Sequence, residues 1–216
     1  GCGGSIDDSY KKVTKAFATI MQKAGVDFRI LGTEEKCNGD TARRLGNEYL
    51  AQTLIQENIA TLNSYNVKKI VTACPHCFHS LKNEYPQFGG NFEVKHHSEF
   101  ISELIENGKL NLKNAEIKKE ITFHDSCYLG RYNQVYDAPR KVLNSASIEI
   151  KEMERSKSRG FCCGAGGGRM FLEDEEGGRI NEERTKEALS TGAETIASAC
   201  PFCMTMLSDG VKHFEK

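Results

Sequence analysis

Nine cysteines occur in this chain at spacings that repeat along the sequence. The set in the first half is Cys2, Cys37, Cys74 and Cys77, and the set in the second half is Cys127, Cys162, Cys163, Cys200 and Cys203. The first two positions recur after 125 residues and the next two after 126, and the residues flanking each Cys-Pro-x-Cys also match. Internal repetition of this kind predicts two similar structural units, which we place at residues 1–112 and 113–216.

Three interpretations of these thiols compete: disulfide bonds, buried structural cysteines and metal ligands. The count is odd, no secretory signal is visible, and 216 residues is well above the size of a disulfide-stapled mini-protein, so a disulfide framework is disfavoured. Structural thiols scattered through a core would not be expected to recur at fixed spacings. The pattern therefore indicates that the cysteines bind metal, as two separate sets.

Charge and hydropathy exclude several other functions. The net charge is −1 and no long basic run occurs, so neither nucleic acid nor an anionic membrane surface has electrostatic support as a partner. No apolar run approaches the roughly 20 residues that a membrane-spanning helix requires. We therefore expect a soluble chain.

Apolar periodicity in the first unit predicts helices that alternate with short strands. A helix is expected over 9–24, because apolar residues recur at helical spacing and Gly25 follows as a stop. Asp40 is a candidate N-cap for one long helix that reaches Leu62. Strands are expected at 26–31, 69–73 and 92–95, and further helices are expected to begin in the Cys-Pro-His-Cys turn and to cover 98–106.

The second unit repeats this order, with strands at 120–123, 148–151 and 194–198 and a helix around 179–190. Strands alternating with helices predict α/β layers with largely parallel sheets. Because cysteines follow the strands, we expect the cluster sites at the carboxyl ends of strands, where the N–H groups of helix N-termini suit an anionic metal–thiolate group. A strand precedes Cys127 but only Gly1 precedes Cys2, so the first unit lacks an opening strand and we expect the chain to come from a longer polypeptide.

The second cysteine set also carries a family resemblance. Cys127, followed by Cys162-Cys163-Gly164 and then by Cys200-Pro201-Phe202-Cys203, resembles the cysteine-rich CCG domain of the B-type heterodisulfide reductase subunits. The same domain is typical of the iron–sulfur subunits of lactate, glycolate and glycerol-3-phosphate oxidoreductases. Two such units in tandem are most similar to the C-terminal part of membrane-linked iron–sulfur oxidoreductases associated with electron-transferring flavoprotein.

The resemblance implies two 4Fe–4S clusters, one on each cysteine set. The second set has five cysteines, which leaves a non-cubane cluster open there. The first unit departs from the pattern, because Asn38 stands where a second adjacent cysteine is expected, and its four cysteines suffice for an ordinary cubane. Four thiolates also form structural zinc sites, so zinc remains an alternative for the first unit.

The function that this resemblance implies is electron transfer within a larger oxidoreductase, between a flavoprotein and a quinone or other acceptor. The implied partners are electron-transferring flavoprotein or another redox protein, and upstream ferredoxin-like and membrane segments of the same polypeptide or complex, at the cytoplasmic face of the membrane. One alternative is heterodisulfide reductase-like disulfide or thiol reduction at the second cluster, which Asn38 disfavours. Another is a zinc-binding interaction module. No catalytic residue is predicted.

Several other residues near the cysteines invite a functional interpretation. The glycine-rich loop at 164–169 directly follows two cysteines, so we interpret it as bare backbone that approaches the cluster rather than as a nucleotide-binding loop. His97 and His124 lie near strand ends, where a role beside the cluster and a role as ordinary core or surface histidines both stay open. His76 has no counterpart in the second unit and is interpreted as incidental. The acidic run at 173–176 is typical of a solvated face, with partner docking as the alternative.

Overall fold

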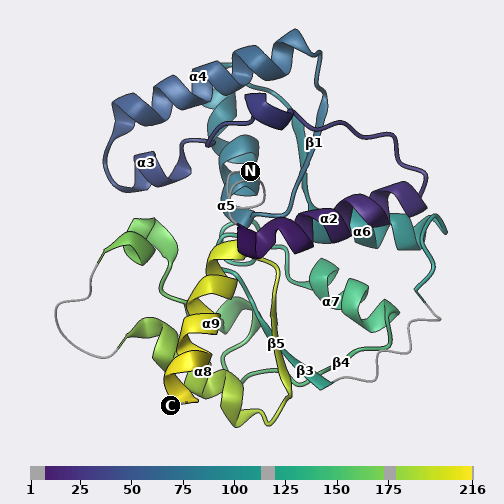
Figure 1. Ribbon diagram of the computed structural model, residues 1–216, viewed down its shortest axis with the longest axis vertical. Helices are drawn as coiled ribbons and strands as arrows, with labels where there is room; N and C mark the ends of the chain where they lie inside the picture. The colour runs from purple at the N-terminus through teal and green to yellow at the C-terminus, as the bar shows by residue number, and fades with distance from the viewer. Residues whose placement is uncertain (1–7, 113–119, 173–178, 216) are drawn as a thin grey trace. The chain divides into compact units, whose positions relative to one another are not determined.

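The computed structural model describes residues 8–112, 120–172 and 179–215. The chain separates into two compact units, residues 1–110 and 111–216, and each is described by itself (Figure 1). In both units short parallel strands pack with helices, which confirms the predicted α/β class. In the described part of the chain, no helix combines the length and the apolar composition needed to cross a membrane.

The first unit is organised around two parallel strands, β1 (Lys69–Thr72) and β2 (Glu93–His96), which pair in register with Thr72 opposite His96. Its helices are α2 (Asp8–Lys23), α3 (Asp40–Arg44), α4 (Glu48–Ser64), α5 (Pro75–His79) and α6 (His97–Glu106). Shorter turns are η1 (Gly32–Glu34), the π-helical turn η2 (Ser80–Glu84) and η3 (Tyr85–Phe88). The helix that begins in the Cys-Pro-His-Cys turn is thereby confirmed as α5.

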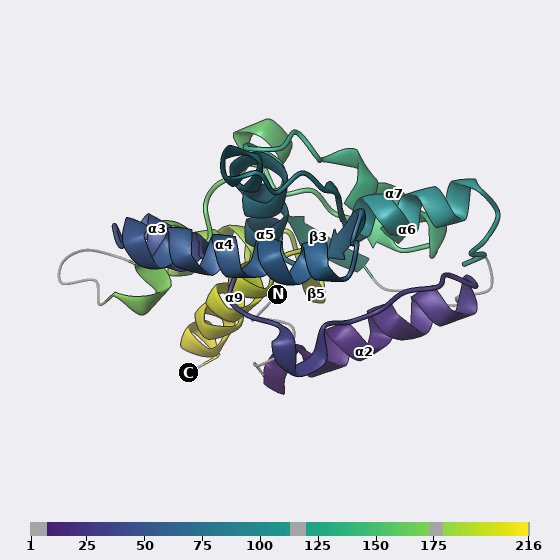
Figure 2. The same ribbon diagram turned by 90° about the horizontal axis from the view of Figure 1, so that it is seen from above.

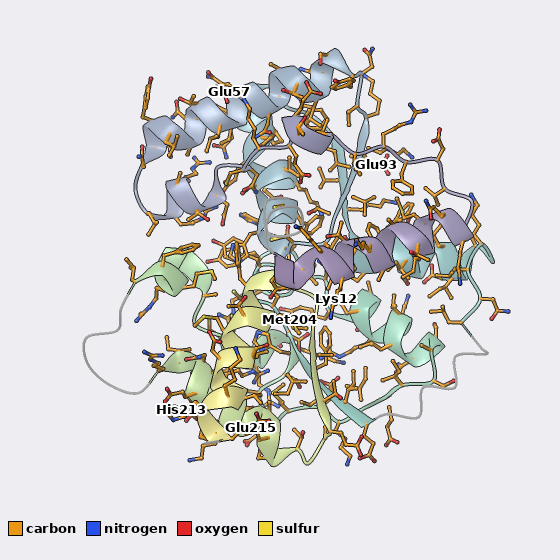
Figure 3. All side chains as sticks on the ribbon, viewed as in Figure 1. Lys12, Glu57, Glu93, Met204, His213 and Glu215 are labelled. Atoms are coloured by element: carbon orange, nitrogen blue, oxygen red, sulfur yellow. The ribbon has the colours of Figure 1, made fainter. Side chains whose placement is uncertain are left out.

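The core of the first unit forms between α4 and the turns that follow α5. Ile55 and Ile59 of α4 pack with Tyr85, which is completely buried. Glu57 lies on the same helix but carries an exposed side chain that pairs with Lys36 at 2.9 Å (Figure 3). Helix α4 therefore packs one side against the core and exposes the other to solvent.

Two predictions about the first unit are wrong. The segment 26–31 is not a strand: it pairs with no described strand, and Ile30 at its end is 80% exposed. The long helix predicted from Asp40 is two helices, α3 and α4, joined by a short turn (Figures 1 and 2). Gly46 adopts a left-handed φ of 86° in that turn, and the Asn47 side chain accepts a hydrogen bond from Leu50 N–H, which starts α4 anew.

The second unit contains a three-stranded parallel sheet in the order β4-β3-β5. The strands are β3 (Glu120–His124), β4 (Glu149–Ile150) and β5 (Thr195–Ser198), and the helices are α7 (Asp137–Ser145), α8 (Ile180–Ser190) and α9 (Pro201–Phe214). Two 3₁₀ turns, η4 (Lys157–Arg159) and η5 (Gly166–Phe171), lie in the long connection between β4 and α8. The predicted strands and α8 are confirmed within a few residues.

Helices α8 and α9 of the second unit run side by side (Figure 1). Gly210 of α9 makes this close approach achievable, because a Cβ atom there would collide with the buried Thr185 side chain of α8. The packing places the start of α9, which carries the last two cysteines, beside the carboxyl ends of β3 and β5.

Candidate metal centres

Both Cys-Pro-x-Cys segments form the same local structure. Cys74 follows β1 in an extended conformation and is the N-cap of α5, with Pro75 as the first helical residue. Cys200 follows β5 in the same way and is the N-cap of α9, with Pro201 next. Proline suits the first helical position because its fixed φ is helical and its missing N–H would have no partner there. Each segment thus presents one cysteine before a helix and one in its first turn.

The described thiols of the second unit form one continuous group. Cys163 Sγ and Cys203 Sγ are 3.3 Å apart, which is contact distance and far longer than a disulfide bond. Interactions with the Cys163 and Cys200 thiols, together with burial, raise the pKa of Cys203 well above its ordinary value. Cys127 interacts in turn with Cys162. Five thiols from three separate segments therefore converge, which sequence spacing alone could only suggest.

The pKa values of the thiols in this group are shifted in opposite directions. Hydrogen bonds from the thiols of Cys127 and Cys163, aided by the Gly164 N–H, lower the pKa of Cys162 far below its ordinary value. The hydrogen bond to Cys162, together with burial, instead raises the pKa of Cys127 above its ordinary value. One thiolate stabilised by its neighbours is the pattern expected where several cysteines are placed to bind a cation together.

The backbone conformation of the Cys-Cys-Gly segment requires glycine at its third position. Gly164 adopts a left-handed φ of 89°, and its N–H donates to Cys162 Sγ at 3.3 Å. A Cβ atom at this position would also lie 3.1 Å from Ile180 Cβ. Glycine is the residue that adopts such a backbone without strain, so the turn that brings its N–H to the sulfur requires it.

Buried polar atoms without partners surround the second cysteine group. Among the described residues, no hydrogen-bond partner is found for His124 Nε2, Ser126 Oγ or Ser198 Oγ. His124 and Ser198 end β3 and β5, Ser126 follows β3, and each lies within three residues of Cys127 or Cys200 in the sequence. Unpaired buried donors are costly, so a sulfur-rich anionic group held by the thiols fits this environment.

His124 is the histidine that the structure brings to the cysteines. One of its ring nitrogens and the Sγ atoms of Cys163 and Cys203 all lie within 4.8 Å of one another. Burial, and the charge of Arg184, lower the pKa of His124 to about 3, so the ring is neutral. His97, the other histidine singled out from the sequence, instead begins α6 and packs against Phe17 and His96.

The first unit brings two of its cysteines together in the same manner. Cys74 and Cys77 are both buried, and a hydrogen bond between them, together with burial, raises the pKa of Cys77 well above its ordinary value. Cys37 is half-buried, and its carbonyl oxygen accepts a hydrogen bond of 2.8 Å from Asn58 Nδ2. Cys2 lies outside the described residues, so its predicted place with the other three stays a prediction.

Asn38 occupies the position that Cys163 has in the second unit, and its amide is used structurally. Its Oδ1 accepts a hydrogen bond from Asp40 N–H at 3.2 Å, and its carbonyl oxygen accepts one from Tyr85 Oη at 3.1 Å. Its Nδ2 is buried without a partner in the described ranges. The substitution removes a thiol but retains a buried N–H donor close to Cys37.

Two buried polar contacts have no signal in the sequence pattern. His76, interpreted as incidental, is buried with its Nδ1 2.9 Å from Asp40 Oδ2, so that interpretation is wrong for the fold. Arg184 of α8 is fully buried and donates from Nε to His124 Nδ1 at 3.0 Å. An arginine in a charged helical segment is usually solvent-exposed, so no local pattern could have indicated this contact.

Comparison with known proteins identifies the family. The model of a cysteine-rich domain, CCG, matches residues 1–82 and again residues 121–208. The chain belongs to this family. The tandem arrangement of the CCG domains follows the two cysteine sets, which confirms the resemblance drawn from their spacing.

Three relatives of this CCG chain are named as oxidoreductases or as an oxidoreductase subunit. It is 52% identical over its whole length to the EtfAB:quinone oxidoreductase of Syntrophomonas wolfei and 52% identical to the probable iron–sulfur-binding oxidoreductase FadF of Bacillus subtilis. It is 39% identical over 93% of its length to one subunit of the dihydromethanophenazine:CoB–CoM heterodisulfide reductase of Methanosarcina barkeri. The chain spans 31%, 30% and 51% of these relatives, respectively.

Proposed function

We propose that this chain is an iron–sulfur electron-transfer module of a larger oxidoreductase, with one cluster in each CCG unit. The observation that carries the proposal is the convergence of five thiols in the second unit, centred on the Cys163–Cys203 contact of 3.3 Å. The family match supports iron–sulfur chemistry for such a set. The ligands proposed are Cys127, Cys162, Cys163, Cys200 and Cys203 in the second unit, and Cys2, Cys37, Cys74 and Cys77 in the first.

A bound 4Fe–4S cluster would supply reversible one-electron transfer. The chain's own residues would provide thiolates, a backbone N–H from Gly164 and burial of most of the sulfur atoms. Hydrogen bonds to sulfur and exclusion of water are the means by which a protein sets the reduction potential of such a group. In this proposal the first unit holds a cubane, with zinc as the alternative, and the fifth thiol of the second unit favours a non-cubane form.

The partner proposed is a flavoprotein, with a quinone or other acceptor on the opposite side of the electron path. The relative named EtfAB:quinone oxidoreductase supports this pairing, because all of this chain matches 31% of that relative at 52% identity. Other parts of the same polypeptide or complex would provide the ferredoxin-like clusters and the attachment to the cytoplasmic face of a membrane.

A second candidate is disulfide or thiol reduction at the second cluster. The observation that favours it is the adjacent pair Cys162-Cys163, together with 39% identity to one part of a heterodisulfide reductase. Saturable oxidation of the reduced clusters by a small disulfide would support this candidate. Fast oxidation by a quinone analogue within the assembled complex, with no response to disulfides, would support electron transfer.

Metal and sulfide analysis of the anaerobically purified chain tests the proposal directly. We expect about eight iron atoms and a comparable amount of inorganic sulfide, as for two 4Fe–4S clusters. About four iron atoms with one zinc would mean that the first unit is a structural zinc site. A chain that binds no iron after anaerobic reconstitution would overturn the proposal. Reduced electron-transferring flavoprotein should then bleach the clusters of the full polypeptide, whereas rapid reduction by a nicotinamide cofactor alone would contradict the partner.

A further inference from the structure

His124 and Arg184 form a buried, hydrogen-bonded pair in the second unit. His124 ends β3 and is 1% exposed, and Arg184 lies in the middle of α8 with no exposed surface. Arg184 Nε donates to His124 Nδ1 at 3.0 Å. The guanidinium is held in this orientation by its Nη1, which donates to the Arg155 carbonyl oxygen at 2.9 Å and to Glu187 Oε2 at 2.8 Å.

This contact fixes the position of the proton on the imidazole. A guanidinium has donors and no acceptor, so His124 Nδ1 must be the unprotonated nitrogen that accepts the hydrogen bond. In a neutral imidazole the proton then resides on Nε2. Turning the ring by 180° would place a carbon-bound hydrogen against Arg184 Nε–H and lose the hydrogen bond, so the alternative orientation is disfavoured.

The fixed Nε2–H has no ordinary acceptor. Among the described residues, Nε2 is buried without a hydrogen-bond partner. The imidazole instead lies beside sulfur, because one of its ring nitrogens is within 4.8 Å of the Sγ atoms of Cys163 and Cys203. A nitrogen that carries its proton has no free lone pair, so Nε2 in this tautomer is suited to donate to sulfur and unsuited to bind a metal ion.

We propose that His124 donates its Nε2–H to a sulfur atom of the cluster in the second unit, and that Arg184 acts through His124 by fixing its tautomer. This inference rests on the proposed function, since it requires the five-cysteine set to hold a cluster. His124 and Arg184 are positioning residues in this role, and His124 is not a metal ligand. The ligand set remains the five thiolates.

The expected consequence is a higher reduction potential for the second cluster. Reduction adds negative charge to the cluster, and an N–H donor stabilises the sulfur more strongly in the reduced state than in the oxidised state. Arg184 is paired with Glu187 at 2.8 Å, and Arg155 contacts the same carboxylate oxygen at 2.9 Å. The charge of Arg184 and the hydrogen bond from His124 are therefore expected to affect the potential separately.

The test compares His124→Leu, which removes the donor, with His124→Gln, whose side-chain amide can place an N–H near the position of Nε2. In the full chain, a redox titration followed by electron paramagnetic resonance gives the potential of each cluster. For His124→Leu we expect the one-electron reduction equilibrium of the second cluster to fall about tenfold, a shift of about 59 mV to more negative potential. His124→Gln should stay close to wild type, and the first cluster should be unchanged in both.

A double-mutant cycle separates the action of Arg184 through His124 from its charge. Arg184→Met in the His124→Leu background reports the effect of the charge alone, and any larger shift in the wild-type background reports action through the imidazole. Two controls accompany the cycle. His213→Leu removes a histidine about 15 Å further along α9 than Cys203 (Figure 3). Leu207→Ala weakens the buried face of α9 without removing a polar group.

Pulsed electron paramagnetic resonance of wild-type protein containing ¹⁵N-histidine provides an independent measurement that needs no variant to fold. A weak nitrogen coupling typical of a hydrogen-bonded imidazole supports the inference, and a strong coupling typical of a directly bound nitrogen overturns it. Iron-replete His124→Leu with an unchanged potential also overturns it while leaving the proposed function intact. Wild-type protein that binds no iron overturns both.

Discussion

The two units of this chain form a similar turn beside their cysteines, but the side chain before the glycine of the turn differs between them. Gly39 and Gly164 both adopt a φ of 89°, so the backbone of Cys37-Asn38-Gly39 resembles that of Cys162-Cys163-Gly164 at this point. The residue before each glycine is buried in both units, as a thiol in one and as an amide in the other. The left-handed glycine is therefore common to both turns, although the buried side chain before it is an amide in the first unit and a thiol in the second.

A second difference is the use of buried histidine. Thr72 and Ser198 are related by the 126-residue offset, and each lies in register with a histidine that ends the neighbouring strand, His96 or His124. His96 Nδ1 is engaged with Ser98 at the start of α6, whereas His124 Nδ1 is engaged by a buried arginine. The first unit uses another histidine, His76, in a buried hydrogen bond with Asp40. In the second unit His124 has one ring nitrogen without a partner and lies beside the thiols of Cys163 and Cys203, and in the first unit His97 Nδ1 is also buried without a partner among the described residues.

The largest effect is expected from removing the matched cysteines, Cys77 in the first unit and Cys203 in the second. Each replacement by serine should remove about half of the bound iron, because each thiol is buried against another cysteine of its own set. Iron analysis with electron paramagnetic resonance should show that the signal lost differs between the two variants. Loss of both signals from either variant would mean that the clusters do not assemble independently.

Cys163→Ser should preserve iron but change the spectrum. Cys163 is the additional thiol of the second unit, since Cys162 aligns with Cys37 by the 125-residue offset. Four cysteines remain in that unit, enough for a cubane, so only the second signal should change. Asn38→Cys is the reciprocal variant, and it tests whether a fifth thiol alters the first signal. Two identical wild-type signals, unaffected by Cys163→Ser, would show that the adjacent cysteine is not a ligand.

Gly39→Ala and Gly164→Ala test whether the two turns are equivalent. Each variant should lose about 1–2 kcal/mol of unfolding free energy, because a side chain disfavours the left-handed backbone. Crowding adds to the cost at both sites, since the new Cβ would lie 3.0 Å from the Ala51 carbonyl oxygen or 3.1 Å from Ile180 Cβ. Gly166→Ala is the matched control, because nothing lies within 4 Å of its Cβ position. Denaturant unfolding of the apo chain measures the unfolding free energy of all three variants. Unequal losses of that free energy in Gly39→Ala and Gly164→Ala would show that the two turns are not equivalent.

The smallest effect is expected from acid titration of the Asp40–His76 pair. Burial alone would raise the pKa of Asp40, but the hydrogen bond and charge of His76, with those of Arg44, outweigh it and lower the pKa. A depressed carboxyl pKa contributes stability that is complete above the unfolded value, about 3.9, and is lost as the pH falls through the folded value. Asp40→Asn should therefore flatten the loss of stability below about pH 4. Asp209→Asn, in an exposed pair with Lys212, controls for the removal of one carboxylate, and equal slopes would refute the assignment.

Spacing and local periodicity along the chain were sufficient to predict the cysteine sets and several of the strands. The offsets of 125 and 126 residues revealed the paired cysteine sets, and the strands leading into Cys74 and Cys200 followed from short apolar runs that end at the cysteines. These signals are readable because strand and helix periods act over a few neighbouring residues. The same reasoning failed at 26–31, where apolar alternation occurs without a partner strand among the described residues, and at Gly46, whose left-handed turn interrupts a continuous apolar pattern.

The contacts between buried polar groups could not be predicted from the sequence, because they depend on the packing of distant segments. His124 and Arg184 are 60 residues apart, and Asp40 and His76 are 36 apart, with no pattern that links either pair in the sequence. Such contacts depend on the packing of helices against strand ends, because this sets the direction of each side chain and the exclusion of water around it. The thiols could thus be recognised as candidate ligands from their spacing. The contact between Arg184 and His124 was instead decided by how α8 packs beside the end of β3.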